Sequence, residues 1–144
     1  MSADLRELSH RLLDEVWNKR NFDVIAELIS PDFVIHDPNY TSGKGPEEYK
    51  KFVHTYLTAF PDTVLTVQDQ VADGSTVATR WTATGTHQGT LNGIPASGRR
   101  VTIEGVSFSK FVDGKFAESW NNWDSLGMLR QIGAVPADSE MQAA

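Results

Sequence analysis

The sequence predicts an α+β domain in which a curved antiparallel sheet packs against three N-terminal helices. Residues 4–60 carry apolar side chains at steps of three and four, whereas residues 64–124 are rich in β-branched and aromatic residues separated by Asp-Gly turns. Helices followed by a meander of strands are typical of the α+β class. The 144 residues, 40% of them hydrophobic, predict one domain over 1–144, with a core at about 5–133 and a loose tail at 134–144.

Three helices follow from the apolar periodicity. Between Asp4 and Asn18, leucine, valine and tryptophan recur at the spacing of a helix with one buried face. A shorter apolar set at residues 22–29 predicts a second helix that ends at Ser30-Pro31, because the residue before proline resists the α conformation. Pro46 suits the first turn of a third helix, whose apolar face extends to Phe60.

The strands follow from short runs of β-branched and aromatic residues. We expect them at residues 33–35, 64–67, 77–87, 101–111 and 115–124. Turns at Asp73-Gly74 and Asp113-Gly114 make the last four strands two antiparallel hairpins. Ser125 to Ile132 predicts a last short helix, closed by Gly133.

The composition excludes several classes of function. Thirteen Lys and Arg against nineteen Asp and Glu give a net charge of -6, so we expect no nucleic-acid partner. The absence of cysteine removes disulfides, thiol nucleophiles and thiolate metal sites. A charged N-terminus and the lack of any stretch of ~20 apolar residues predict a cytoplasmic protein without a membrane anchor.

Acid–base chemistry in a pocket is the activity that the residues favour, because no phosphate loop, His-Glu-x-x-His helix or nucleophile elbow is present. Two-residue alternation places Asp124 on one strand face with Phe116 and Trp120, where aromatic neighbours raise a carboxyl pKa toward the range of a general base. Asp124 also directly precedes the last helix and is equally suited to cap it.

Two histidines are further candidates for catalysis. His36 ends the first predicted strand beside Asp37, and alternation lets only one of the two face inward; we favour His36. His87 falls on the same face as Trp81, although a histidine hydrogen-bonded at a strand end beside Gly89 is the more common situation. Neither histidine has the spacing of a metal-ligand set, and we predict no metal.

A group of aromatic side chains is predicted to form the core and also to line a cavity that binds a small hydrophobic molecule. These candidate substrate-binding residues are Trp17, Tyr56, Phe60, Trp81, Phe116 and Trp120. Because apolar sheet surface is left uncovered by the helices, we expect a homodimer.

Several segments together resemble the SnoaL-like polyketide cyclases: Ala59-Phe60-Pro61-Asp62, Gly85-Thr86-His87-Gln88-Gly89 with the later Gly93 to Gly98, Glu118-Ser119-Trp120 with Asp124, and Leu129-Arg130-Gln131-Ile132-Gly133. The resemblance covers about residues 5–133. It implies the nuclear transport factor 2-like, or cystatin-like, fold, a cone formed by a curved sheet and helices. It also implies Asp124 as the general acid/base of an aldol-type ring closure that needs no cofactor.

The sequence is also compatible with two other functions. A non-catalytic protein of the same fold would bind a small hydrophobic ligand in the same pocket. Epoxide hydrolysis, as in the limonene epoxide hydrolases that this fold also contains, is disfavoured because Thr82 stands two residues after Arg80, where that family has an aspartate. Within the favoured class, the sequence predicts a cyclase or isomerase acting on a polyketide-like or other hydrophobic carbonyl compound.

Overall fold

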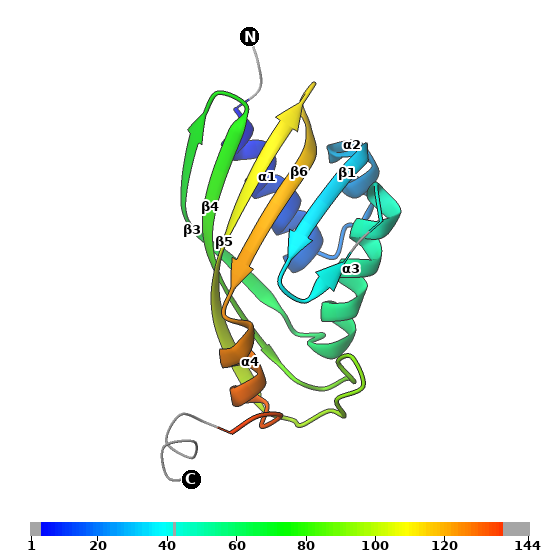
Figure 1. Ribbon diagram of the computed structural model, residues 1–144, viewed down its shortest axis with the longest axis vertical. Coiled ribbons are helices and arrows are strands. Elements are labelled where there is room, and N and C mark those ends of the chain that lie inside the picture. Colours follow the sequence, from blue (N-terminus) through cyan, green and yellow to red (C-terminus); the bar gives the residue numbers. More distant parts are fainter. Residues whose placement is uncertain (1–3, 42, 137–144) are drawn as a thin grey trace.

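The computed structural model describes residues 4–41 and 43–136, and Figure 1 shows how its elements are arranged. The elements are α1 (Leu5–Leu13), the π-helical turn η1 (Asp14–Asn18), α2 (Asp23–Leu28), β1 (Ile29–Asp37), β2 (Tyr40–Thr41), α3 (Pro46–Ala59), β3 (Val64–Asp73), β4 (Thr76–Thr86), β5 (Arg100–Val112), β6 (Lys115–Trp123) and α4 (Ser125–Gln131). The α+β class predicted from the sequence is confirmed. The tail expected at 134–144 lies mostly outside the described residues.

The sheet is mixed, with the strand order β2-β1-β6-β5-β4-β3. Neighbouring strands are antiparallel except β1 and β6, which are parallel and bring His36 opposite Trp120. This corrects the expectation of a wholly antiparallel sheet. Parallel neighbours need a long connection, and here α3 and the strands β3 to β5 supply it (Figure 1).

The first strand is longer than the sequence predicted. Residues 33–35 are only the middle of β1, which begins at Ile29 and includes Pro31. The register of β1 on β6 shifts between Ile29 and Val34, so Pro31 falls where no regular ladder hydrogen bond is required. β1 ends at Asp37, which lies beside the C-terminal end of β6.

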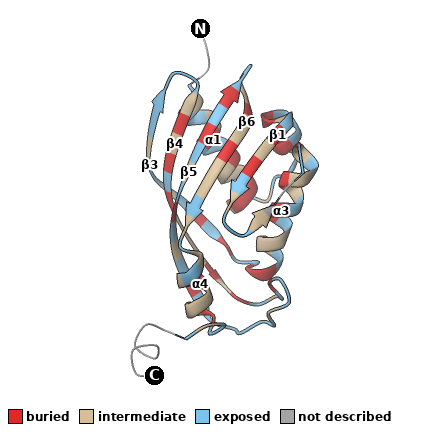
Figure 2. Ribbon diagram, in the orientation of Figure 1, coloured by how far each residue is buried: buried red, intermediate tan, exposed pale blue. Residues whose placement is uncertain are grey.

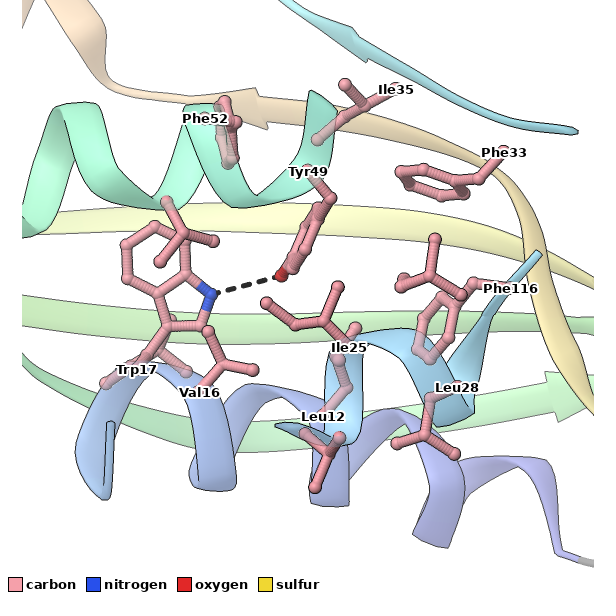
Figure 3. Close-up of a cluster of buried hydrophobic side chains, with 14 of the residues drawn as sticks. Leu12, Val16, Trp17, Ile25, Leu28, Phe33, Ile35, Tyr49, Phe52 and Phe116 are labelled. Atoms are coloured by element: carbon pink, nitrogen blue, oxygen red, sulfur yellow. Dashed lines mark hydrogen bonds between the residues drawn. The ribbon is translucent and has the colours of Figure 1, made fainter. Parts of the chain in front are cut away.

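The main core lies between α1, η1, α2 and α3 and the inner face of the sheet (Figure 3). Buried residues alternate with intermediate ones along most of β4 and with exposed ones along much of β5 (Figure 2), so mainly one face of these strands contributes to the core. Trp17 donates its indole N–H to the Tyr49 hydroxyl over 3.3 Å. Burial raises the pKa of Tyr49 to about 12, so this phenol stays protonated.

A second cluster of buried side chains closes the end of the molecule where α4 lies. Its members are Ala59, Phe60, Leu91, Val101, Met128 and Ile132. They join the end of α3, the connection between β4 and β5, and α4, so the cavity described below is covered at this end. Among the described residues, no helix combines the length and the apolar character needed to cross a membrane.

Candidate active site

A cavity of about 120 Å³ lies between the helices and the inner face of the sheet. Its walls are mainly apolar and include Leu12, Trp17, Phe52, Phe60, Trp81 and Phe116. An engineered apolar cavity of ~150 Å³ accommodates benzene, so this space holds roughly one ring. The apolar surroundings favour a hydrophobic guest and strengthen any electrostatic interaction made inside.

Asp37 is the one charged residue among the described residues that line this cavity. Its Oδ2 accepts hydrogen bonds from Trp123 Nε1 at 3.0 Å and from Asn121 Nδ2 at 3.4 Å. Its Oδ1 accepts a bond from the backbone N–H of Asn39 at 3.0 Å. Three N–H donors from two segments of the chain therefore fix the orientation of the carboxylate.

A directed chain of hydrogen bonds sets the orientation of Asn121. Trp81 Nε1 lies 3.0 Å from Ser107 Oγ, and Ser107 Oγ lies 2.8 Å from Asn121 Oδ1. An indole N–H only donates, so the Ser107 hydroxyl accepts it and gives its own proton to Asn121 Oδ1. The NH₂ end of Asn121 is thereby turned toward Asp37.

Gly105 makes room for the two tryptophans of this network. Trp81, Gly105 and Trp123 are directly opposite one another on β4, β5 and β6. A Cβ atom at position 105 would lie 2.4 Å from Trp81 Cζ2 and 2.8 Å from Trp123 Cβ. The absence of a side chain on the middle strand lets both indoles approach it from either side.

Tyr56 on α3 brings a hydroxyl to the same part of the cavity. Its ring contacts that of Trp123 edge to face at 5.7 Å between centroids. Burial raises the pKa of the Tyr56 phenol, and the charge of nearby Asp37 raises it further. The phenol is therefore protonated at neutral pH and can donate a hydrogen bond beside a carboxylate base.

Comparison with known proteins places this chain in a family. The family model described as SnoaL-like polyketide cyclase matches residues 7–132. The aklanonic acid methyl ester cyclase DnrD of Streptomyces peucetius is 31% identical over 129 residues, which cover 85% of this chain and 87% of that protein. The chain belongs to the SnoaL-like polyketide cyclase family.

Two further similarities support this membership. The nogalonic acid methyl ester cyclase of Streptomyces nogalater is 28% identical over 127 residues, covering 86% of this SnoaL-like chain and 94% of that protein. The solved structure of TsrD from Streptomyces laurentii superposes with a TM-score of 0.82 at 28% identity and covers 93% of this chain and 100% of that one.

Most of the aromatic residues singled out in the SnoaL-like sequence line the cavity: Trp17, Tyr56, Phe60, Trp81 and Phe116. The prediction for Trp120 was wrong, because its side chain lies outside the cavity and packs against His36 and Phe108. On β6 the inner face belongs to Ser119, Asn121 and Trp123, and the intervening residues point outward. Phe116 reaches the cavity because the β5–β6 register is irregular between Lys110 and Phe111.

Asp124 is exposed and does not line the cavity. Its Oδ1 accepts the backbone N–H of Gly127 at 2.8 Å, which makes Asp124 the N-cap of α4. The capping interpretation of this residue is confirmed. The carboxylate that the geometry brings to the cavity of this SnoaL-like protein is Asp37 instead.

The two histidines also lie outside the cavity. His36 is exposed on the outer face, where its Nε2 lies 2.7 Å from Glu118 Oε2 and its ring stacks on Trp120, so the inward residue of the pair is Asp37. His87 is fully buried behind Phe60, and its Nδ1 accepts the backbone N–H of Ser97 at 3.1 Å. The strand-end interpretation of His87 is confirmed.

Sequence reasoning did not assign a role to Ser107, Asn121 or Trp123. The two-residue alternation of β6 already grouped Asn121 with Trp123, and that grouping was the available signal. Within residues 4–41 and 43–136, no cluster of three or more His, Asp or Glu side chains is arranged to hold a metal ion.

Proposed function

We propose that this protein is a cyclase that closes a ring in a polyketide-like carbonyl compound, with Asp37 as the general base. The observation that carries the proposal is a single carboxylate, held by three N–H donors, at the wall of an apolar cavity. The relatives named as aklanonic and nogalonic acid methyl ester cyclases support a polyketide ester as the class of substrate.

The reaction is a proton transfer followed by formation of a carbon–carbon bond. The Asp37 carboxylate removes a proton from the carbon activated by a neighbouring carbonyl, and the electron pair becomes an enolate. The enolate carbon attacks a second carbonyl of the same molecule. The resulting alkoxide takes back the proton from the Asp37 carboxyl group, so the residue ends in its starting state.

Tyr56 and the cavity walls complete this mechanism. The protonated Tyr56 hydroxyl donates to the oxygen on which negative charge develops. The aromatic walls hold the reacting end of the substrate so that its two carbons meet, which is worth about 7–11 kcal/mol of the barrier in well-placed intramolecular reactions. Because the cavity is about 120 Å³, we propose that a larger polyketide places only its reacting ring inside.

Conversion of aklanonic acid methyl ester to its cyclised isomer, followed by liquid chromatography, tests the proposal. We expect turnover by the wild-type protein and a loss of roughly 10²–10⁴-fold in kcat for Asp37→Asn, the usual contribution of a general base. Asp32→Asn, an exposed change on the same strand, is the matched control.

Deuterium uptake tests the proton-transfer step without a ring closure. The activated methylene of 1-(4-methylphenyl)propan-2-one exchanges in D₂O, and NMR measures the rate with each variant. We expect Asp37→Asn to abolish the enzymatic exchange. Retained exchange in Asp37→Asn together with its loss in Asp124→Asn would return the base to Asp124. Binding of the ketone with no exchange in any form would indicate a ligand-binding protein.

We propose also that the outer face of the sheet binds a second copy of this chain. Val106 and Phe108 are each 45% exposed there, and Phe108 packs edge to face on Trp120. Lys110 lies over the Trp120 ring and is opposite Glu118 in the sheet, so the patch carries both signs of charge, and a twofold axis could bring Lys110 of one copy to Glu118 of the other. Sedimentation measures the oligomeric state. We expect the wild type to sediment as a dimer and Phe108→Glu as a monomer, and a monomeric wild type would contradict the proposal.

A further inference from the structure

Two buried serines form a second polar contact point in the cavity. Ser109 on β5 and Ser119 on β6 are opposite each other, are 4% and 6% exposed, and both line the cavity. Their Oγ atoms are 2.7 Å apart. The pair lies two residues along each strand from Ser107 and Asn121, so it is ~7 Å from the network that holds Asp37.

Counting protons shows that one hydroxyl of this pair is free to donate. Two serines bring two O–H donors, and the bond between them uses one. Among the described residues, no acceptor lies within hydrogen-bond distance of the other. Ser107 differs, because it accepts from Trp81 and donates to Asn121 and so has both roles filled.

The surroundings offer this spare O–H little besides apolar side chains. The next residues on this face of the sheet are Phe111 and Phe116, whose ring centroids are 4.4 Å apart. Phe33 and Ile35 of β1 line the same cavity. A donor left unpaired in such surroundings is unfavourable, and an oxygen of a bound molecule removes the penalty.

We propose that the Ser109–Ser119 pair binds a carbonyl or hydroxyl oxygen of the substrate, distant from the carbon that reacts. This inference rests on the proposed function, because it takes Asp37 as the reacting end of the cavity. It narrows the substrate to carbonyl compounds that carry a second oxygen on the side away from the activated carbon, which a hydrocarbon-tailed ketone lacks. The pair thereby acts in specificity and leaves the chemical step to Asp37.

Two probes of nearly equal shape test the contact. They are 1-(4-hydroxyphenyl)propan-2-one and 1-(4-methylphenyl)propan-2-one, which differ only in the oxygen or methyl group across the ring from the activated methylene. Calorimetric titration gives the ratio of their dissociation constants for the wild type, Ser109→Ala, Ser119→Ala, the double Ala variant and the exposed-turn control Ser75→Ala.

Each single variant keeps one hydroxyl of the serine pair, whereas the double variant keeps neither. We expect the ratio to shift toward the methyl probe by roughly five- to tenfold in the double variant, the worth of one hydrogen bond, and to shift less in either single variant. An unchanged ratio in the double variant overturns the proposal, as does a wild type that binds only the methyl probe. Thermal unfolding checks that each variant is folded.

The same titration separates this inference from the proposed function. Asp37→Asn is expected to lose deuterium exchange and to keep the wild-type probe ratio, because its change lies at the other end of the cavity. If exchange persists in Asp37→Asn while the double serine variant loses its selectivity, the base is wrong and the oxygen contact stands. The opposite pattern refutes the contact alone.

Discussion

Trp123 donates its indole N–H to the Asp37 carboxylate over 3.0 Å, and this bond joins the end of β6 to the end of β1. The two residues are 86 positions apart in the chain, yet the parallel pairing of β1 with β6 brings their strands together. The candidate base is therefore held by a side chain from the last strand of the sheet, and its position depends on that pairing.

Trp123→Phe is expected to lower activity while preserving the fold. Phenylalanine keeps an aromatic ring against Tyr56 but has no N–H for Asp37. A hydrogen bond to a charged group is worth about 1.5 kcal/mol or more, so we expect roughly a tenfold decrease in kcat with a smaller change in KM. Steady-state kinetics measures it, and an unchanged kcat argues that Asp37 needs no such support.

Asp124→Ala is expected to reduce stability and leave catalysis intact. The substitution removes the N-cap of α4 and costs about 1 kcal/mol in the free energy of unfolding. Urea denaturation gives this value, and Asp32→Ala provides the comparison for an exposed carboxylate without a cap. A loss of kcat as large as that expected for removal of the general base would show that Asp124 does more than cap α4.

Gly105→Ala is expected to destabilise the sheet by about 1–3 kcal/mol, because the added methyl group overlaps Trp81 and Trp123. Trp81→Phe in the same chain removes the nearest of the overlapping atoms, Cζ2. A double-mutant cycle in urea should therefore give a favourable coupling energy between the two changes. Strict additivity of the two free energies would show that the sheet relaxes around the methyl group without moving the indole.

Alkaline pH is expected to destabilise the protein through Tyr49. Its pKa is 10.0 in an ordinary environment and about 12 in the folded protein, because burial disfavours the phenolate. Above pH 10 the unfolded chain loses this proton and the folded chain keeps it, so the free energy of unfolding falls by up to about 1.4 kcal/mol per pH unit.

Urea denaturation between pH 8 and 11 measures this dependence. Tyr49→Phe removes the phenol, so its free energy of unfolding should fall less steeply above pH 10 than that of the wild type. Lysine titration affects both proteins equally, and the difference between the two slopes isolates Tyr49. Parallel slopes would mean that this phenol titrates normally in the folded state.

The fold could be predicted because its signals are periodic. The apolar spacing of residues 4–18 and the Asp-Gly turns mark helices and hairpins from local sequence alone. The parallel β1–β6 pairing could not be predicted in this way. It depends on contacts between residues such as Val34 and Glu118, which no local pattern links.

The candidate site was harder to predict, because alternation defines two strand faces without saying which is inside. The sequence placed Asp124 with Trp120, and the structure turns the other set, Asn121 and Trp123, to the cavity. For the same reason, His36 was predicted to face inward, whereas Asp37 is the residue that lines the cavity. Tyr56 and Trp81 were identified correctly as lining residues, since on α3 and β4 the buried face carries nearly all of the large apolar side chains.

The place of β6 in the sheet has a consequence for synthesis on the ribosome. A nascent chain that has emerged only as far as β4 contains every helix of the main core and also Asp37, but none of the partners that β6 supplies. Its first strand is then an unprotected edge, open to pairing with other polypeptides until the last hairpin arrives. The Asp37 carboxylate thus gains its Asn121 and Trp123 donors only after β5 and β6 have emerged and joined the sheet between β4 and β1.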